Sequence, residues 1–340
     1  MENVFINREE ELNRLHELYN SFLKGARIGV LVYGLRRVGK TRLIQEFIKN
    51  KASIEVNCAF IGDAKQFYNK ILTLILERFN PPDEWIKKVD NIMNTISSEI
   101  GSYEYALNML VKISEMTNLK IVAFLDEFHL FLDKLSVKVA REEKTNKKRA
   151  TLDLLWVLKS VVDKGRVFFI LSSSLGWEKI QELMQRKTKE HPLLGIFERI
   201  EVKPLSKEDT IKLARAYNED LTEEQLISIA EISGGIPKIV ISIAIRAKRN
   251  ESIANLAVKM LKDGEFDDFF ENLIKLIDEV IPYDYPLIIS VLLKIAEGIK
   301  TAKEISSSLK IDERIVRGVL LELVKSACSH NSIFVFYWLF

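Results

Sequence analysis

The sequence predicts an α/β protein whose core is a parallel β-sheet. Short apolar runs recur through the first 204 residues, and segments with helical spacing of apolar positions separate them. Strands covered by helices on both faces have this continuous apolar character, which is typical of parallel sheets. A glycine-rich turn between the first run and the helix that follows it is the third observation, and it also points to chemistry.

Each element follows from a local pattern. The predicted strands are 28–33, 53–57, 120–125, 167–171 and 198–202. The predicted helices among them are 9–22, 42–48, 63–79, 83–100, 102–116 and 151–162. Asn7 is expected to cap the first helix. The segment 138–149 carries six basic and two acidic residues. We expect a solvated loop there, with a DNA contact or a basic patch near the nucleotide of a neighbouring subunit as the alternatives.

The glycine-rich turn fits the phosphate-loop pattern G-x-x-x-x-G-K-[ST] at every fixed position. Its sequence is Gly34-Leu35-Arg36-Arg37-Val38-Gly39-Lys40-Thr41. Glycines let the backbone curl so that successive N–H groups cradle phosphate oxygens, and the helix N-terminus adds partial positive charge. Lys40 is expected to reach the β- and γ-phosphates, and the Thr41 hydroxyl to hold Mg²⁺. The alternative is an ordinary glycine turn before a surface helix.

Two carboxylates, Asp126 and Glu127, follow the apolar run 121–125. A buried strand that ends in acid beside a phosphate loop is the expected second half of a nucleotide site. Asp126 would hold Mg²⁺ directly or through water, and Glu127 would orient and deprotonate the attacking water. Without the phosphate loop, an acidic strand end facing solvent would be the better interpretation.

Three serines, 172–174, end the apolar run 167–171. Hydroxyls at the end of a central strand next to a Mg²⁺ site can sense the γ-phosphate or hold the attacking water. Ser173 is the predicted sensor. The alternative is that these hydroxyls only cap the next segment.

After Pro204 the pattern changes to short helices, predicted at 206–217, 222–232 and 237–248. The last 55 residues contain two short helices joined by a tight turn, which suggests helix-turn-helix, and a strand-like end at 332–340. We therefore predict a phosphate-loop core at 1–204, a helical lid at 205–282 and a winged-helix-like domain at 283–340.

Composition bounds the remaining possibilities. The chain has 340 residues, of which 47% are hydrophobic and 29% charged, as expected for a globular protein. The net charge of +2 provides no global attraction to nucleic acid or membrane, so such binding needs a local patch. Two cysteines make no disulfide framework. No apolar run is long enough to span a bilayer and the first residues lack a signal-peptide pattern, so we expect a cytoplasmic protein.

Together these motifs resemble the archaeal ATPase family, of the STAND branch of AAA+-like P-loop ATPases, over roughly residues 1–330. The resemblance implies a parallel sheet in the order 5-1-4-3-2, a helical lid and a C-terminal winged helix. It also implies that the opening segment 5–12 lies near the adenine, which the element Gly235-Ile236-Pro237 contacts from the lid. The implied ligands of ATP or ADP are Phe5, Ile6, Arg8, Gly34, Leu35, Arg36, Arg37, Val38, Gly39, Lys40, Thr41, Arg42 and Pro237.

The function expected from these features is an ATP-hydrolysing, Mg²⁺-dependent molecular switch that couples nucleotide state to the winged helix. The alternative is a DNA-binding regulator whose affinity is modulated by ATP. A small-molecule kinase is disfavoured, because Glu127 directly follows Asp126 and is placed to serve water. Residues 283–340 are expected to bind DNA or a protein, and a nucleotide-dependent oligomer is possible.

Overall fold

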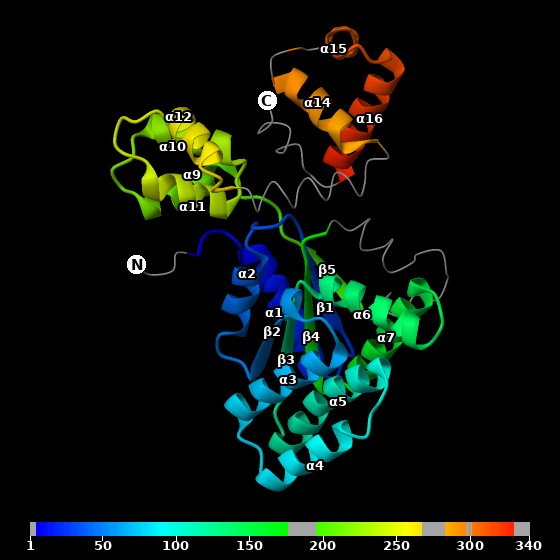
Figure 1. The fold of residues 1–340 in the computed structure, drawn as a ribbon. Coiled ribbons are helices and arrows are strands. Elements are labelled where there is room, and N and C mark those ends of the chain that lie inside the picture. The colour runs from blue at the N-terminus through cyan, green and yellow to red at the C-terminus, as the bar shows by residue number, and fades with distance from the viewer. Residues whose placement is uncertain (1–4, 176–194, 267–282, 297–298, 300, 330–340) are drawn as a thin grey trace. The chain divides into compact units, whose positions relative to one another are not determined.

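The structure of the protein is a computed structural model (Figure 1). The residues it describes are 5–175, 195–266, 283–296, 299 and 301–329. Contacts divide the chain into two compact units. The sheet unit consists of Arg8–Gly34 and Lys40–Val202, and the helical unit consists of Met1–Asn7, Leu35–Gly39 and Lys203–Phe340. Each unit is described here by itself. The predicted division into three domains stays a prediction.

The sheet unit contains a five-stranded parallel sheet in the order β2-β3-β4-β1-β5. Its strands are β1 (Gly29–Tyr33), β2 (Ser53–Asn57), β3 (Ile121–Asp126), β4 (Val167–Ser173) and β5 (Phe197–Glu201). Read from the other edge, this is the predicted order 5-1-4-3-2, so the expected α/β fold is confirmed. The observed strand bounds lie within two residues of those predicted from the apolar runs.

Helices cover both faces of the sheet (Figure 1). They are α1 (Glu9–Leu23), α2 (Lys40–Ile48), α3 (Ala64–Phe79), α4 (Asp83–Met93), α5 (Glu99–Thr117), α6 (Phe128–Glu142) and α7 (Lys147–Val162), with a short 3₁₀ turn, η1, at Cys58–Phe60. Side chains alternate between the two faces of a strand, and the neighbours Phe168 and Phe169 illustrate this. Phe168 packs against Phe22 of α1 and Phe47 of α2, whereas Phe169 joins the large cluster under α3, α5, α6 and α7.

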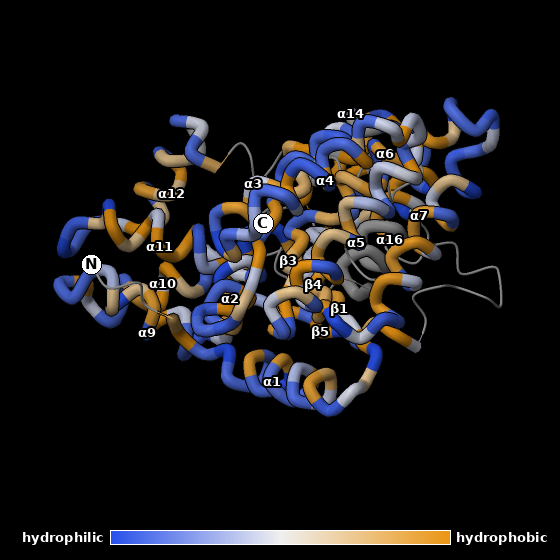
Figure 2. The backbone as a smooth tube through the Cα atoms, turned by 90° about the horizontal axis from the view of Figure 1, so that it is seen from below, coloured by the Kyte–Doolittle hydropathy of each residue, from blue (hydrophilic) through white to orange (hydrophobic). Residues whose placement is uncertain are grey.

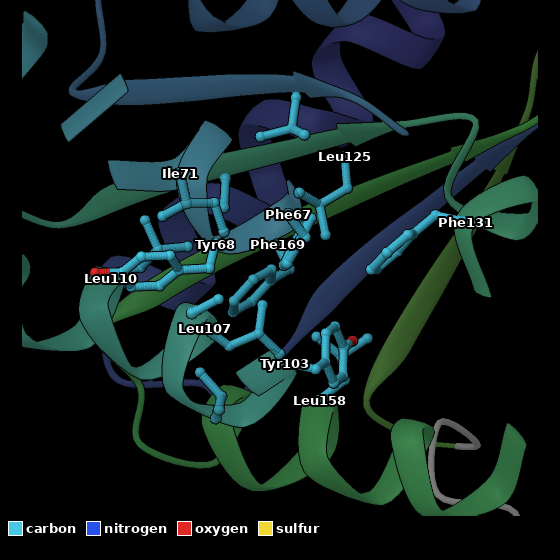
Figure 3. Packing of buried hydrophobic residues seen from close by; sticks show 14 of the residues in the cluster. Phe67, Tyr68, Ile71, Tyr103, Leu107, Leu110, Leu125, Phe131, Leu158 and Phe169 are labelled. Atoms are coloured by element: carbon cyan, nitrogen blue, oxygen red, sulfur yellow. The ribbon is translucent and has the colours of Figure 1, made fainter. Parts of the chain in front are cut away.

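That large cluster is the main core of the sheet unit. Figure 3 shows Phe67 of α3, Tyr103 of α5 and Phe131 of α6 gathered beside Phe169, and all four side chains are buried. Phe67 and Phe131 stack with ring centroids 4.7 Å apart. Figure 2 shows the hydrophobic character of the strands that run through this core. Burial on both faces explains why continuous apolar runs were sufficient to locate β1, β3 and β4.

Two expectations about the helices were wrong in part. The predicted helix 83–100 ends at Met93, and a new helix begins at Glu99, because the Ser98 side chain accepts a hydrogen bond from Gly101 N and caps it. The basic segment 138–149 is not mainly a loop: most of it is the end of α6 and the start of α7. Its side chains are mostly exposed, so the expectation of solvation holds.

The helical unit begins with a bundle of α9 (Lys207–Tyr217), α10 (Glu223–Ser233), α11 (Pro237–Arg246) and α12 (Ile253–Lys262). The first three match the predicted helices closely. A capping box starts α10: the Thr222 side chain accepts a hydrogen bond from Gln225 N, and the Gln225 side chain accepts one from Thr222 N. Apolar residues of all four helices form one core, and Ile6 packs against it.

A second cluster of the helical unit is formed by α14 (Tyr285–Ala296), α15 (Ala302–Leu309) and α16 (Glu313–Ser329). Ile305 of α15 and Val316 of α16 are buried against Ile288 of α14. The connection between α15 and α16 turns at Lys310, which has φ +56°. The predicted pair of helices joined by a tight turn is therefore present. The predicted strand 332–340 lies outside the described residues. In the ranges described, no helix has the length and hydrophobicity needed to cross a membrane.

Candidate functional site

The phosphate loop connects β1 to α2 and has the curled backbone that its glycines predict. Gly34, Arg37 and Gly39 have φ values of +149°, +65° and +104°. A side chain at Gly34 would place its Cβ 2.3 Å from the carbonyl oxygen of Val202, so glycine is required there. Arg37 is a non-glycine residue in the left-handed region, a conformation that costs free energy and is concentrated at functional sites.

Lys40 is the first residue of α2 and is only 4% exposed. Its Nζ donates to the carbonyl oxygen of Gly34 at 3.0 Å, so the ammonium group lies across the loop. The next residue, Thr41, donates from Oγ1 to Oδ2 of Asp126 at 3.1 Å. This bond directly connects the phosphate-loop helix to the acidic end of β3, and it brings together the two residues whose role as Mg²⁺ ligands stays a prediction.

Asp126 ends β3 and is 7% exposed. Burial raises the pKa of its carboxyl group, and the neighbouring charge of Glu127 adds to the rise. Hydrogen bonds from Ser172 and Thr41 and the charge of Lys40 lower the pKa and so oppose this effect. The buried carboxylate is thus held close to a cation and two hydroxyl donors, a setting in which a further positive charge would be stabilised.

Glu127 follows Asp126 in a left-handed conformation, with φ +51° and ψ +41°. It precedes α6 without capping it. Its Oε2 instead accepts hydrogen bonds from the backbone N and the Oγ of Ser174, at 3.0 and 2.9 Å. Its own backbone N donates to Ser172 Oγ at 2.9 Å. The second acid therefore turns toward the end of β4 rather than toward its own helix.

The three serines at the end of β4 have different partners. Ser172 donates to Oδ1 of Asp126, and Ser174 donates to Glu127. Ser173, the predicted sensor, lies in strand register with Tyr33, the residue before the phosphate loop, and its Oγ is 3.2 Å from Nδ1 of His129. The structure therefore brings Ser173 next to the site, where its sensor role stays a prediction.

Sequence reasoning missed the contribution of His129 and did not assign partners to Ser172 and Ser174. His129 lies in the first turn of α6, and its Nδ1 is 3.4 Å from Glu127 Oε2. The sequence signal for His129 is its place two positions after the acidic pair, in the first turn of the helix that follows the pair. The pairing of Ser172 with Asp126 had no such signal, because it depends on the strand register, in which Leu125 lies opposite Leu171.

A buried thiol also borders the acids. Cys58 follows β2 in the η1 turn. Burial raises the pKa of the Cys58 thiol well above its ordinary value, and the charges of Asp126 and Glu127 raise it further. The thiol is consequently neutral at physiological pH and adds no charge to the site.

The other predicted nucleotide ligands are placed as follows. Arg36 is exposed in the loop, and Arg42 lies 3.8 Å from Glu46 on α2. Arg8 is buried and pairs with Glu11 of α1 at 3.0 Å. Phe5, Ile6, Leu35, Val38 and Pro237 are described within the helical unit. There, Val38 N donates to Leu35 O at 3.4 Å and Pro237 opens α11.

The start of α1 corrects one expectation. Asn7 does not cap this helix: the N-cap residue is Arg8, and its side chain makes no capping hydrogen bond to the first turn. The Asn7 side chain instead donates to Asp209 of α9. A long-range partner has therefore replaced the local cap that the sequence suggested.

The oxygen atoms available as metal ligands at the junction of α2 and β3 fit Mg²⁺. The hydroxyl of Thr41 and the carboxylate of Asp126 are hard oxygen ligands, and they already lie within hydrogen-bonding distance of each other. Mg²⁺ commonly takes one or two protein oxygens and completes its octahedral shell with phosphate and water. The pair therefore suits an ion that arrives with a nucleotide.

Comparison with known proteins agrees with this geometry. An uncharacterized ATP-binding protein of Methanocaldococcus jannaschii is 46% identical over 48 residues, which are 14% of this chain and 76% of that protein. A Walker-type ATPase of Pyrococcus abyssi matches with 19% identity and a TM-score of 0.62, over 94% of this chain and 89% of that one. The ORC2 protein of Aeropyrum pernix in its ADP form matches with 16% identity and a TM-score of 0.51, over 96% and 87%.

The two solved structures show a shared fold, which agrees with the parallel sheet and its strand order. The family match is more specific. Residues 5–243 fit an ATPase domain found predominantly in Archaea, and this range spans β1 to β5, the phosphate loop, the acidic pair and the helices through most of α11. This protein belongs to that family of archaeal ATPase domains.

Proposed function

We propose that the protein binds ATP with Mg²⁺, hydrolyses it, and uses its nucleotide state as a molecular switch. The observation that carries this proposal is the contact between Thr41 and Asp126 at 3.1 Å, with Lys40 buried beside them and Glu127 next in the chain. It joins the phosphate-binding and acidic parts of the site in the arrangement that hydrolysis of a phosphoanhydride needs.

Each residue has a distinct task in this proposal. Backbone N–H groups of the loop and Lys40 bind the phosphate oxygens, while Thr41 and Asp126 hold Mg²⁺. The ion, when bound, neutralises charge that develops on the phosphoryl oxygens. Glu127 orients the attacking water and accepts its proton, and the Ser174 donors on Oε2 keep this carboxylate in place.

The switch part of the proposal involves the helical unit, with 205–282 as lid and 283–340 as a winged-helix domain. Ile6 packs against the core that includes Ile239, which lies in the first turn of the helix that Pro237 opens. This shared cluster supports an adenine site lined by Phe5, Ile6 and Pro237. Contacts to the γ-phosphate that exist only before hydrolysis would then bias the lid and, through it, the C-terminal domain.

The test is a pair of substitutions measured for nucleotide binding and for phosphate release. Lys40→Ala should abolish ATP binding, because the loop then lacks the buried ammonium group that binds the phosphates. Glu127→Gln should retain ATP binding and lose hydrolysis by about 10²- to 10⁴-fold, the contribution of a positioned general base. Isothermal titration with ATP and Mg²⁺ and a steady-state phosphate assay provide the two readouts.

Lys49→Ala is the matched control, since Lys49 is an exposed lysine just beyond the same helix and, among the described residues, pairs with Glu46 alone, at 3.5 Å. It should behave as wild type in both assays. Normal turnover by Glu127→Gln would show that the assignment of the base is wrong, and normal ATP binding by Lys40→Ala would refute the phosphate site.

A second candidate function is a DNA-binding regulator whose affinity depends on ATP. It is favoured by the helix-turn-helix arrangement of α15 and α16, with the Arg314 side chain 91% exposed at the start of α16. Arg317 is exposed one turn later, although it pairs with Glu313 at 2.6 Å. Duplex DNA binding measured at several salt concentrations tests this function, because phosphate contacts weaken steeply with salt. This function would be rejected if the protein does not bind duplex DNA. It would also be rejected if binding does not depend on salt and is unchanged in Arg314→Ala.

A further inference from the structure

The unusual backbone of Glu127 directs its side chain to a specific set of donors. The left-handed conformation at φ +51° is unfavourable for glutamate and needs compensation from its surroundings. Compensation is visible at Oε2, which accepts two hydrogen bonds from Ser174. The other oxygen of Glu127, Oε1, accepts no hydrogen bond from the described residues. One oxygen thus anchors the carboxylate and leaves the other to receive a proton from water.

His129 is the third group at this anchor. Its Nδ1 lies 3.4 Å from Glu127 Oε2 and 3.2 Å from Ser173 Oγ. A neutral imidazole carries its proton on either Nδ1 or Nε2. With an unprotonated Nδ1, the nitrogen lone pair would face the negative carboxylate, which is repulsive. With a proton on Nδ1, the same nitrogen is attracted to the carboxylate and can donate to Ser173. The carboxylate therefore selects the Nδ1–H form.

This choice determines what the Ser173 hydroxyl can do. Ser173 Oγ then accepts from His129 Nδ1 and also from the backbone N of Leu175 at 3.1 Å. A hydroxyl has two acceptor positions and one proton. Both acceptor positions are occupied, so the proton is left to donate, and it has no acceptor in the part of the chain that the structure describes. In the Nε2–H form, by contrast, Ser173 would donate to the histidine.

The strand register places this donor next to the phosphate loop. Ser173 lies opposite Tyr33, and Gly34 follows Tyr33 directly. β4 lies between β3, which ends in the acidic pair, and β1, which leads into the loop. A donor at the end of β4 is thus on the same sheet edge as the acids and the loop, where an anionic phosphoryl oxygen would be bound.

We propose that His129 is a positioning residue that connects the base to the sensor: its Nδ1–H holds Glu127 by Oε2 and makes the Ser173 hydroxyl a hydrogen-bond donor for the terminal phosphoryl group. This inference rests on the proposed ATPase function and extends it to a residue with no direct contact to the reacting atoms. It predicts that loss of the Nδ1 donor disturbs two groups together, the base and the serine.

Two substitutions of His129 separate this role from simple packing. His129→Asn keeps an N–H donor near the position of Nδ1, whereas His129→Leu has similar bulk and no donor. We expect His129→Leu to lower kcat about 10- to 100-fold, the usual effect of losing a group that orients a catalytic residue. The Kd for a non-hydrolysable ATP analogue should change less than about twofold. His129→Asn should recover most of the lost kcat.

A double-mutant cycle with Ser173→Ala tests the connection itself. If His129 acts partly through Ser173, the effect of His129→Leu on kcat will be smaller in the Ser173→Ala background than in wild type. Equal losses from His129→Leu and His129→Asn, or kcat effects that multiply in the double variant, would overturn the proposal. So would wild-type turnover by His129→Leu.

A readout that is independent of catalysis is the ¹⁵N chemical shift of the imidazole nitrogens in the nucleotide-free protein. The chain has four histidines, so the His129 signals can be assigned by their loss in His129→Asn. A protonated Nδ1 is expected, and an Nε2–H tautomer would overturn the inference whatever the activity. Failure of the proposed function is seen separately, as absent hydrolysis by wild type or normal hydrolysis by Glu127→Gln.

Discussion

At the scale of single residues, Ser172 does more than its place at the end of a strand suggests. Its fully buried hydroxyl donates to Asp126 and accepts from the backbone N of Glu127, so one small side chain holds both acids. Removal of this hydroxyl leaves a buried N–H group without its acceptor and deprives a buried carboxylate of a donor. Both changes are unfavourable in a region of low dielectric constant.

Ser172→Ala should therefore lower the free energy of unfolding by about 1–3 kcal/mol, the cost of an unsatisfied buried polar group. It should also raise the Mg²⁺ concentration needed for half-maximal hydrolysis, because Asp126 loses a group that orients it. Urea unfolding and a Mg²⁺ titration measure the two effects. Ser160→Ala, on the exposed side of α7, is the control and should leave both unchanged. If Ser172→Ala changes neither the free energy of unfolding nor the Mg²⁺ dependence of hydrolysis, the proposed role is wrong.

At the scale of an element, α9 is anchored by a buried carboxylate in its first turn. Asp209 accepts hydrogen bonds from Ser206, Lys212 and the side chain of Asn7. Burial alone would raise the pKa of Asp209, but these three hydrogen bonds and the charge of Lys212 bring it below the ordinary value of 3.8. The ionised form thus stabilises the folded protein, and it also ties the N-terminal segment to the bundle.

This stabilisation has a defined dependence on pH. Since the folded-state pKa is lowered, the unfolded chain binds more protons, so the contribution is complete above about pH 3.8 and is lost as the pH falls through the folded-state pKa. Asp209→Ala should cost about 1–3 kcal/mol at neutral pH, and the difference from wild type should shrink in acid. Urea unfolding at several pH values measures it, with the exposed Asp220→Ala as control. A difference that does not change with pH would contradict this account.

The connection into α11 depends on a glycine for its geometry. Gly235 has φ +73°, its carbonyl oxygen accepts from Leu205 N at 2.8 Å, and an added Cβ would lie 2.2 Å from the Leu205 carbonyl oxygen. Gly235→Ala should destabilise the protein by at least about 1 kcal/mol. Gly25→Ala is the matched control, because Gly25 also has positive φ but has no atom within 4 Å of a Cβ. If the two variants lose the same free energy of unfolding in urea, backbone strain and not the close approach is responsible.

At the scale of the whole molecule, nucleotide binding should appear as a gain in thermal stability. A ligand present at 100 times its Kd stabilises the folded state by about 2.7 kcal/mol, which corresponds to a rise in Tm of about 5–10 °C for a domain of 150–250 residues. We expect such a rise with ATP and Mg²⁺ in wild type and in Lys49→Ala, and none in Lys40→Ala. Differential scanning calorimetry measures it, and an equal rise in Lys40→Ala would refute the proposed site.

Much of the fold and of the site was predictable from local patterns. The strands β1, β3 and β4 were located because both of their faces are covered, so their runs are almost entirely apolar. The phosphate loop and the pair Asp126–Glu127 were recognisable because their chemistry requires particular residues at fixed spacing. The capping box of Thr222 and Gln225 was predictable because both hydrogen bonds are made within one helical turn.

The remaining features depend on contacts between segments that are far apart in the sequence. The sequence by itself determined the fold class, the loop and the acidic pair. Only the tertiary structure decided that Ser172 meets Asp126, that Ser174 and His129 meet Glu127, and that Asn7 binds α9 instead of capping α1. The partners of the two acids follow from the register of β3 against β4 and from the left-handed turn at Glu127, because a shift of one residue would reverse which side chains face each other.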